Sequence, residues 1–91
     1  MYDLFETNEF LASIAKLQKR DETLIRNKLK NYVYPQIREE PHFGTNIKKL
    51  RNYSPDTWRY RIGNYRVFYT IDDKDNLVLL LVVVNRGKAY R

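Results

Sequence analysis

Alternating polar and apolar residues in the C-terminal half predict a β-hairpin. The alternation runs over residues 58–62 and resumes over residues 65–71, and the intervening pair Gly63-Asn64 is typical of a two-residue turn. This turn fixes the register, because a one-residue slip would move every side chain to the other face. The predicted cross-strand pairs are Ile62 with Tyr65, Arg61 with Arg66, Tyr60 with Val67, Arg59 with Phe68 and Trp58 with Tyr69. One face of the hairpin is therefore apolar and the other basic.

Two segments of the N-terminal half, residues 8–19 and 21–35, carry apolar side chains at helical spacing. A short apolar run at residues 2–5 precedes them and is predicted as a first strand. Asp21 is the expected N-cap of the second helix, and Pro35 is expected to kink or end that helix because it lacks a backbone N–H. The two segments predict an antiparallel helical hairpin joined by a short polar turn.

The remaining pattern completes a sheet. Residues 47–50 read as a short extended piece, and residues 77–84 are apolar on both faces, as expected for a central strand. A sheet with one apolar face needs a cover, and the helical hairpin is the only amphipathic candidate. The predicted fold class is α+β, with an N-terminal strand and a two-helix antiparallel hairpin packed on one face of a mostly antiparallel sheet. Residues 1–91 are expected to form a single domain.

Composition excludes several classes of protein. The longest apolar run, residues 77–84, is far shorter than the about 20 residues that cross a bilayer. With no cysteine and one histidine, neither a disulfide framework nor a structural metal site is expected. The glycines form no phosphate-binding loop. We therefore expect no cofactor and no small-molecule ligand. Residues 1–6 lack the basic and apolar regions of an export signal, which favours a cytoplasmic protein.

The excess positive charge lies entirely in the C-terminal half. The net charge is +6; residues 1–45 hold equal numbers of basic and acidic side chains, whereas residues 46–91 hold 10 basic and 4 acidic ones. Arginines in that half alternate with tyrosine and tryptophan, which suits contacts with phosphates and stacked bases. A polyanion is therefore the leading partner class, and an ordinary soluble basic domain is the alternative.

Three arginines, Arg59, Arg61 and Arg66, share the basic face of the predicted hairpin. Opposed like charges destabilise a sheet by a few tenths to about 1 kcal/mol per pair, so their clustering indicates a bound anion that offsets the repulsion. Guanidinium groups match phosphate oxygens in a bidentate way. The alternative is that these side chains are gatekeeping charges on an exposed face.

Arg86 and Tyr90 follow the central strand and would reach the same surface if that strand lies beside the hairpin. Tyr90 offers a ring that can stack on a base and a hydroxyl that can donate a proton; the alternative is a tail aromatic that packs on the sheet edge. His42 has an ordinary pKa near neutrality, but a lone loop histidine is more often a surface residue than a catalyst. Lys48 and Lys49 are adjacent, so only one of them can join the arginine cluster.

Two motifs stand out in this half of the chain: Arg-x-Arg-x-Gly-x-Tyr-Arg at residues 59–66 and Arg-x-x-x-Tyr at residues 86–90. Together with the order strand, two helices, sheet, they resemble the RelE/ParE superfamily of type II toxins, in its RelE branch. The resemblance spans nearly the whole chain. It implies a ribosome-dependent mRNA endonuclease, or mRNA interferase, that cuts codons in the ribosomal A site without a metal. It also implies a cognate antitoxin that neutralises the toxin, with the ribosome and mRNA as further partners.

The resemblance implies catalytic roles for Arg59, Arg61, Arg66, Arg86 and Tyr90. The reaction is attack of a ribose 2′-hydroxyl on the neighbouring phosphorus, which needs a proton acceptor, stabilisation of phosphorane charge and protonation of the leaving 5′-oxygen. Arginine cannot be the base because its guanidinium stays protonated. Some members carry lysine at positions 59 and 61, and many carry histidine in place of Asn85, so the base in this chain is unassigned. The expected catalysis is positioning plus charge stabilisation by the arginines, with Tyr90 stacking on a base or assisting proton transfer.

Two other functions share these features. A ParE-like inhibitor of DNA gyrase would have the same fold but would act by binding a protein. A catalytically inactive RNA-binding module would bind with a steep salt dependence and make no cut.

Overall fold

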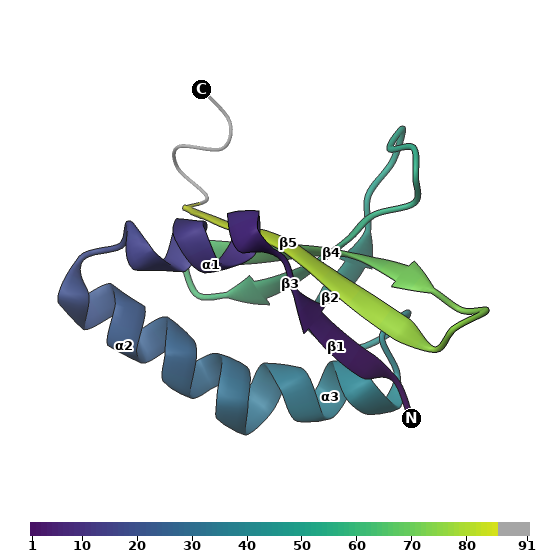
Figure 1. Cartoon of the computed structure of the whole chain (residues 1–91), viewed down its shortest axis with the longest axis horizontal. Helices are drawn as coiled ribbons and strands as arrows, with labels where there is room; N and C mark the ends of the chain where they lie inside the picture. Colours follow the sequence, from purple (N-terminus) through teal and green to yellow (C-terminus); the bar gives the residue numbers. More distant parts are fainter. Residues whose placement is uncertain (86–91) are drawn as a thin grey trace.

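A computed structural model describes residues 1–85, whose five strands form one sheet in the order β1-β5-β4-β3-β2 (Figure 1). The strands are β1 (Asp3–Glu6), β2 (Ile47–Lys49), β3 (Trp58–Ile62), β4 (Tyr65–Asp72) and β5 (Leu77–Asn85). Only β1 and β5 pair in parallel; the other neighbours are antiparallel. The α+β class predicted from the sequence is confirmed.

The β3–β4 hairpin has the register that the sequence predicts. All five expected pairs are present, from Ile62 opposite Tyr65 to Trp58 opposite Tyr69. Gly63 occupies the turn with φ of 54°, a left-handed conformation that glycine adopts without steric cost. Strand β5 lies between β1 and β4, as expected for a strand that is apolar on both faces.

The helices are α1 (Asn8–Ala15), α2 (Lys19–Lys28) and α3 (Tyr34–Glu39), with the π-helical turn η1 (Leu29–Val33) between α2 and α3. The first helix is shorter than predicted, because the chain turns after Ala15 and Leu17 packs against the core. The prediction that Asp21 caps the second helix is wrong. Gln18 holds the cap position, and the Asp21 carboxylate accepts a hydrogen bond of 2.8 Å from the Tyr65 hydroxyl.

The sequence predicts that Pro35 kinks or ends the second helix, and the structure shows that the helix does not end there. Figure 1 shows α2 and α3 as one continuous rod along one side of the sheet, with Pro35 in the first turn of α3. A proline ring inside an α-helix clashes with the carbonyl four residues earlier. The wider π turn over residues 29–33 lies directly before Pro35 and gives the ring room, so the helix continues to Glu39.

One continuous core joins the helices to a single face of the sheet. The buried helical residues are Phe10, Ile14, Ile25, Leu29, Val33 and Ile37, and the buried strand residues are Trp58, Tyr60, Ile62, Val67, Tyr69, Val78, Leu80 and Val83. The helices therefore cover one face and leave the basic face of the hairpin on the opposite side.

In the part of the chain that the structure describes, no helix has the length and apolar character needed to cross a membrane.

Thr7 fixes the start of α1 to the sheet, and its removal gives a stability prediction. Its hydroxyl accepts a hydrogen bond of 3.2 Å from the Phe10 backbone N–H and donates one of 2.7 Å to the Leu80 carbonyl. The isosteric change Thr7→Val removes both bonds, so we expect the free energy of unfolding to fall by about 1–2 kcal/mol. Urea denaturation measures this loss. Thr45→Val, at an exposed loop position, is the control; an equal effect of both changes would contradict the capping role.

Candidate anion-binding face

The arginines predicted from the hairpin pattern lie together on the sheet face that the helices leave open. Arg59 and Arg61 project from β3 between the buried residues of that strand, and Arg66 on β4 is the direct partner of Arg61. Strand pairing also puts Lys48 of β2 opposite Arg59. These four residues, Lys48, Arg59, Arg61 and Arg66, are called the arginine face below. Their positive charges are brought together by three neighbouring strands.

The two arginine side chains of β3 are held by backbone carbonyls rather than by carboxylates. Half-buried Arg59 donates from Nη1 to the Asn46 carbonyl at 2.7 Å, and exposed Arg61 points its Nε toward the Gly63 carbonyl at 3.5 Å. Within residues 1–85 neither guanidinium forms an ion pair. A phosphate that binds there in a bidentate way would meet guanidinium groups that form no ion pair with a described carboxylate.

The sequence leaves open which of two adjacent lysines joins the arginines, and the structure shows that it is Lys48. The adjacent residue Lys49 pairs with Trp58 instead, and its Nζ lies 3.3 Å from the Asp56 carboxylate and over the Trp58 ring. Adjacent residues of a strand point to opposite faces, so only one lysine could join the arginines. The register between β2 and β3 decides that it is Lys48.

Arg86 and Tyr90, the C-terminal members of the predicted site, lie outside the described residues. Strand β5 ends at Asn85, whose partner across the ladder is Tyr65, next to Arg66. The contribution of Arg86 and Tyr90 to this surface stays a prediction.

His42 lies away from the arginine face, among groups on the other side of the sheet. Its ring packs edge-on against Trp58, with centroids 5.6 Å apart, and Trp58 points to the face opposite Arg59. The His42 Nδ1 is 2.8 Å from the Glu40 carboxylate and its Nε2 is 3.1 Å from that of Asp73. His42 therefore joins the loop after α3 to the β4–β5 turn.

The charges around His42 shift the pKa values of the cluster. Partial burial lowers the pKa of His42, but hydrogen bonds to Glu40 and Asp73 outweigh that effect and raise it above its ordinary value. Hydrogen bonds from the His42 backbone and ring lower the pKa of the Glu40 carboxyl. The Tyr2 hydroxyl at 2.6 Å, followed by His42, lowers the pKa of the Asp73 carboxyl. The two carboxylates thus favour the charged form of the imidazole.

We expect the change His42→Gln to destabilise the protein more at about pH 5.5 than at about pH 9. A raised histidine pKa contributes stability that is fully present below its unfolded value of about 6.5 and is lost as the pH rises through the folded value. The lowered carboxyl pKa values contribute stability above about pH 4 that is lost in acid. Urea denaturation of both proteins at the two pH values checks this. The same loss at both would mean that His42 contributes by packing only.

Known proteins are similar to this chain in both sequence and fold. A family model described as the ParE toxin of the type II toxin-antitoxin system, parDE, matches residues 6–90. A chain of the toxin–antitoxin complex RelBE2 from Mycobacterium tuberculosis is 27% identical with a TM-score of 0.72, over 93% of this chain and 98% of that one. A chain of the archaeal RelE–RelB complex from Pyrococcus horikoshii is 25% identical with a TM-score of 0.57, over 96% and 97% of the two chains.

The isolated RelE toxin of E. coli shares the fold, with 24% identity and a TM-score of 0.68 over 99% of this chain and 92% of that one. No curated protein gives a significant sequence match. These structures cover nearly the whole chain, and the residues that the family model matches include the three strands that build the arginine face.

Proposed function

Because this chain belongs to the ParE toxin family of type II toxin–antitoxin systems and has a RelE-like fold, we propose that it is a ribosome-dependent mRNA endonuclease. The observation that carries the proposal is the arginine face: Arg59, Arg61 and Arg66 meet on one open surface, and no described carboxylate pairs with Arg59 or Arg61. Such a surface suits a phosphodiester whose negative charge increases during reaction.

The proposed reaction is an in-line displacement within the RNA strand. The ribose 2′-oxygen forms a bond to the adjacent phosphorus, and the bond from phosphorus to the 5′-oxygen of the next nucleotide breaks. The 2′-hydroxyl loses its proton and the leaving 5′-oxygen gains one. The products are a 2′,3′-cyclic phosphate and a 5′-hydroxyl, and the balance requires no metal or cofactor.

The arginines act on charge and position rather than on protons. A guanidinium does not deprotonate in a protein, so Arg59, Arg61, Arg66 and Arg86 are assigned to aligning the phosphate and stabilising the phosphorane. Tyr90 is assigned to stacking on a base or assisting proton transfer. Lys48 adds a fourth described cation beside Arg59.

The proposed partners are the ribosome with its mRNA, in the cytoplasm, and a cognate antitoxin. Two of the three solved structures named above are chains of toxin–antitoxin complexes. In this proposal an antitoxin segment folds on the toxin and either fills the arginine face or displaces Tyr90. The complex should then lose RNA cleavage while the toxin core stays folded; a complex that still cuts RNA would exclude this mode.

The second candidate is inhibition of DNA gyrase, which the match to a family model named for ParE favours. A supercoiling assay with purified gyrase, run beside a cell-free translation reaction, separates the two functions. An RNA-cutting toxin should stop translation and leave supercoiling unchanged. Loss of supercoiling with translation intact would reverse the assignment. A catalytically inactive RNA-binding module would cut no message and would leave supercoiling unchanged.

A further inference from the structure

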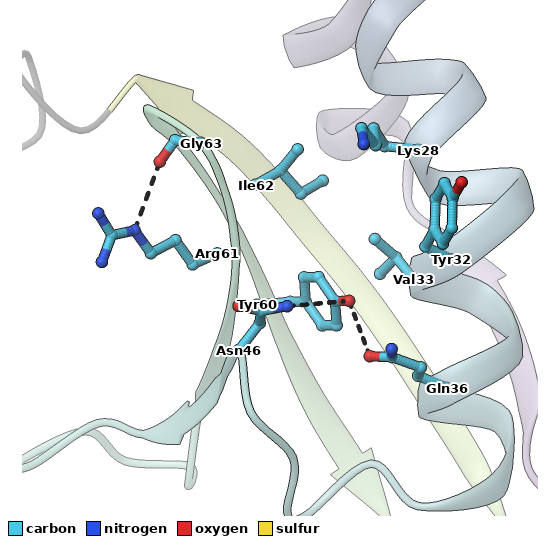
Figure 2. Close-up of a pocket in the computed structure, with 9 residues that line it drawn as sticks. All are labelled: Lys28, Tyr32, Val33, Gln36, Asn46, Tyr60, Arg61, Ile62 and Gly63. Atoms are coloured by element: carbon cyan, nitrogen blue, oxygen red, sulfur yellow. Dashed lines mark hydrogen bonds between the residues drawn. The ribbon is translucent and has the colours of Figure 1, made fainter.

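A second surface feature lies at the edge of β3, on the helix side of the sheet. It is a cavity of about 320 Å³ between β3 and the long helix, the continuous rod of α2, η1 and α3. Its lining residues are Lys28, Tyr32, Val33, Gln36, Asn46, Tyr60, Arg61, Ile62 and Gly63 (Figure 2). Val33, Tyr60 and Ile62 are buried and form an apolar floor, whereas the helical residues at the rim are exposed. The volume is at the lower end of the range for ligand pockets and is larger than one nucleobase requires.

Two amide side chains are oriented in this pocket by one buried tyrosine. The Tyr60 hydroxyl donates to Gln36 Oε1 at 2.7 Å and lies 3.5 Å from Asn46 Nδ2, which donates to it (Figure 2). Gln36 Nε2, the second N–H of Asn46 and Asn46 Oδ1 form no hydrogen bond among residues 1–85. Two amides that line one pocket offer both donors and acceptors, as does the edge of a nucleobase.

The rim of the pocket adds an aromatic ring and positive charge. Tyr32 is 56% exposed, and the Lys28 ammonium lies 4.9 Å from the centre of its ring. An exposed tyrosine ring is a platform on which any base can stack, and a nearby cation suits the phosphate attached to that base. A bare anion site would not need the ring or the amides.

The pocket borders the arginine face at the edge of β3, because Arg61 belongs to both. Strand β2 pairs with β3 as far as Tyr60, and beyond the bond from the Arg61 N–H to the Asn46 carbonyl the edge is open. Figure 2 shows the Arg61 side chain pointing away from the pocket, from the same stretch of strand whose Tyr60 and Ile62 point into it. A strand of RNA bound at Arg61 can therefore turn over this edge at Gly63.

We propose that this pocket is a nucleobase subsite, which holds one unstacked base of the RNA that flanks the cleaved phosphate. The base stacks on Tyr32, its edge bonds to Gln36 and Asn46, and Lys28 contacts its phosphate. The inference rests on the proposed RNA substrate but not on catalysis, so binding and cleavage are measured separately. A protein side chain inserted by a partner is the competing occupant.

Nuclear magnetic resonance titration of the full chain with each of the four nucleoside 5′-monophosphates tests the subsite. We expect the side-chain amide signals of Gln36 and Asn46 to shift with at least one nucleotide and not with ribose 5-phosphate, which lacks a base. The change Tyr32→Leu should weaken that binding by at least roughly fivefold, because it removes the stacking platform. Tyr53→Leu is the matched control, since Tyr53 is a half-exposed tyrosine outside the pocket.

Three results would overturn the subsite: amide signals that do not respond to any nucleotide, the same response to ribose 5-phosphate, or unchanged affinity in the Tyr32→Leu protein. If the amide signals of Gln36 and Asn46 do not respond to any nucleotide but become protected in the antitoxin complex, the pocket is a protein-docking site. Nucleotide binding in a protein that cuts no RNA would instead refute the proposed function and leave the subsite standing.

Discussion

Replacing Arg61 with alanine is expected to lower the rate of RNA cleavage on the ribosome by about 10²–10³-fold. Arg61 is exposed, belongs to no ion pair within residues 1–85, and has only a 3.5 Å contact to the Gly63 carbonyl. Its loss should therefore leave the fold intact while removing one donor that stabilises the phosphorane. The measurement is the single-turnover cleavage rate with programmed ribosomes, alongside circular dichroism of the protein.

Two further variants make this prediction specific. Arg61→Lys keeps the charge but loses the planar fork, so its rate should lie between those of the wild type and the alanine variant. Arg38→Ala removes the same charge from an exposed position on α3, on the helix side of the sheet, and should leave the rate unchanged. Equal losses in the Arg61 and Arg38 variants would show that only overall charge matters.

The change Phe10→Ala is expected to lower the free energy of unfolding by about 3–5 kcal/mol. The Phe10 side chain is fully buried on α1, which packs on the central strand β5. Its removal leaves a cavity in the one core that joins the helices to the sheet. Domains are stable by about 5–15 kcal/mol in total, so this variant should be near the limit of folding.

Leu11 provides the matched control, one residue along the same helix. It is 38% exposed, so Leu11→Ala should cost less than about 1 kcal/mol. Urea denaturation of both variants compares them directly. A similar loss for the two would contradict the described orientation of α1 on the sheet.

The hairpin and its arginines could be predicted because local rules determine them. A strict alternation and a two-residue turn at Gly63 leave one register, and that register puts Arg59, Arg61 and Arg66 on one face. The apolar run of β5 likewise indicated a central strand. These features depend on neighbours in the sequence, so no tertiary information was needed.

The features that the sequence did not predict depend on packing between distant segments. The helix passes Pro35 because a π turn forms before it, and the sequence rule for proline assumes regular α-helical geometry. The assignment of Lys48 to the arginine face depends on how β2 pairs with β3. The Tyr32 pocket combines the long helix with the β3 edge, which are far apart in the chain.

Primer extension on a message translated in a cell-free system with the purified protein, beside the same message without ribosomes, tests the central claim most directly. The proposal predicts cuts at codons being translated only when ribosomes are present, with a cyclic phosphate on the upstream product. An uncut message in both reactions, with translation proceeding normally, would contradict it and would make the arginine face a docking surface for another partner.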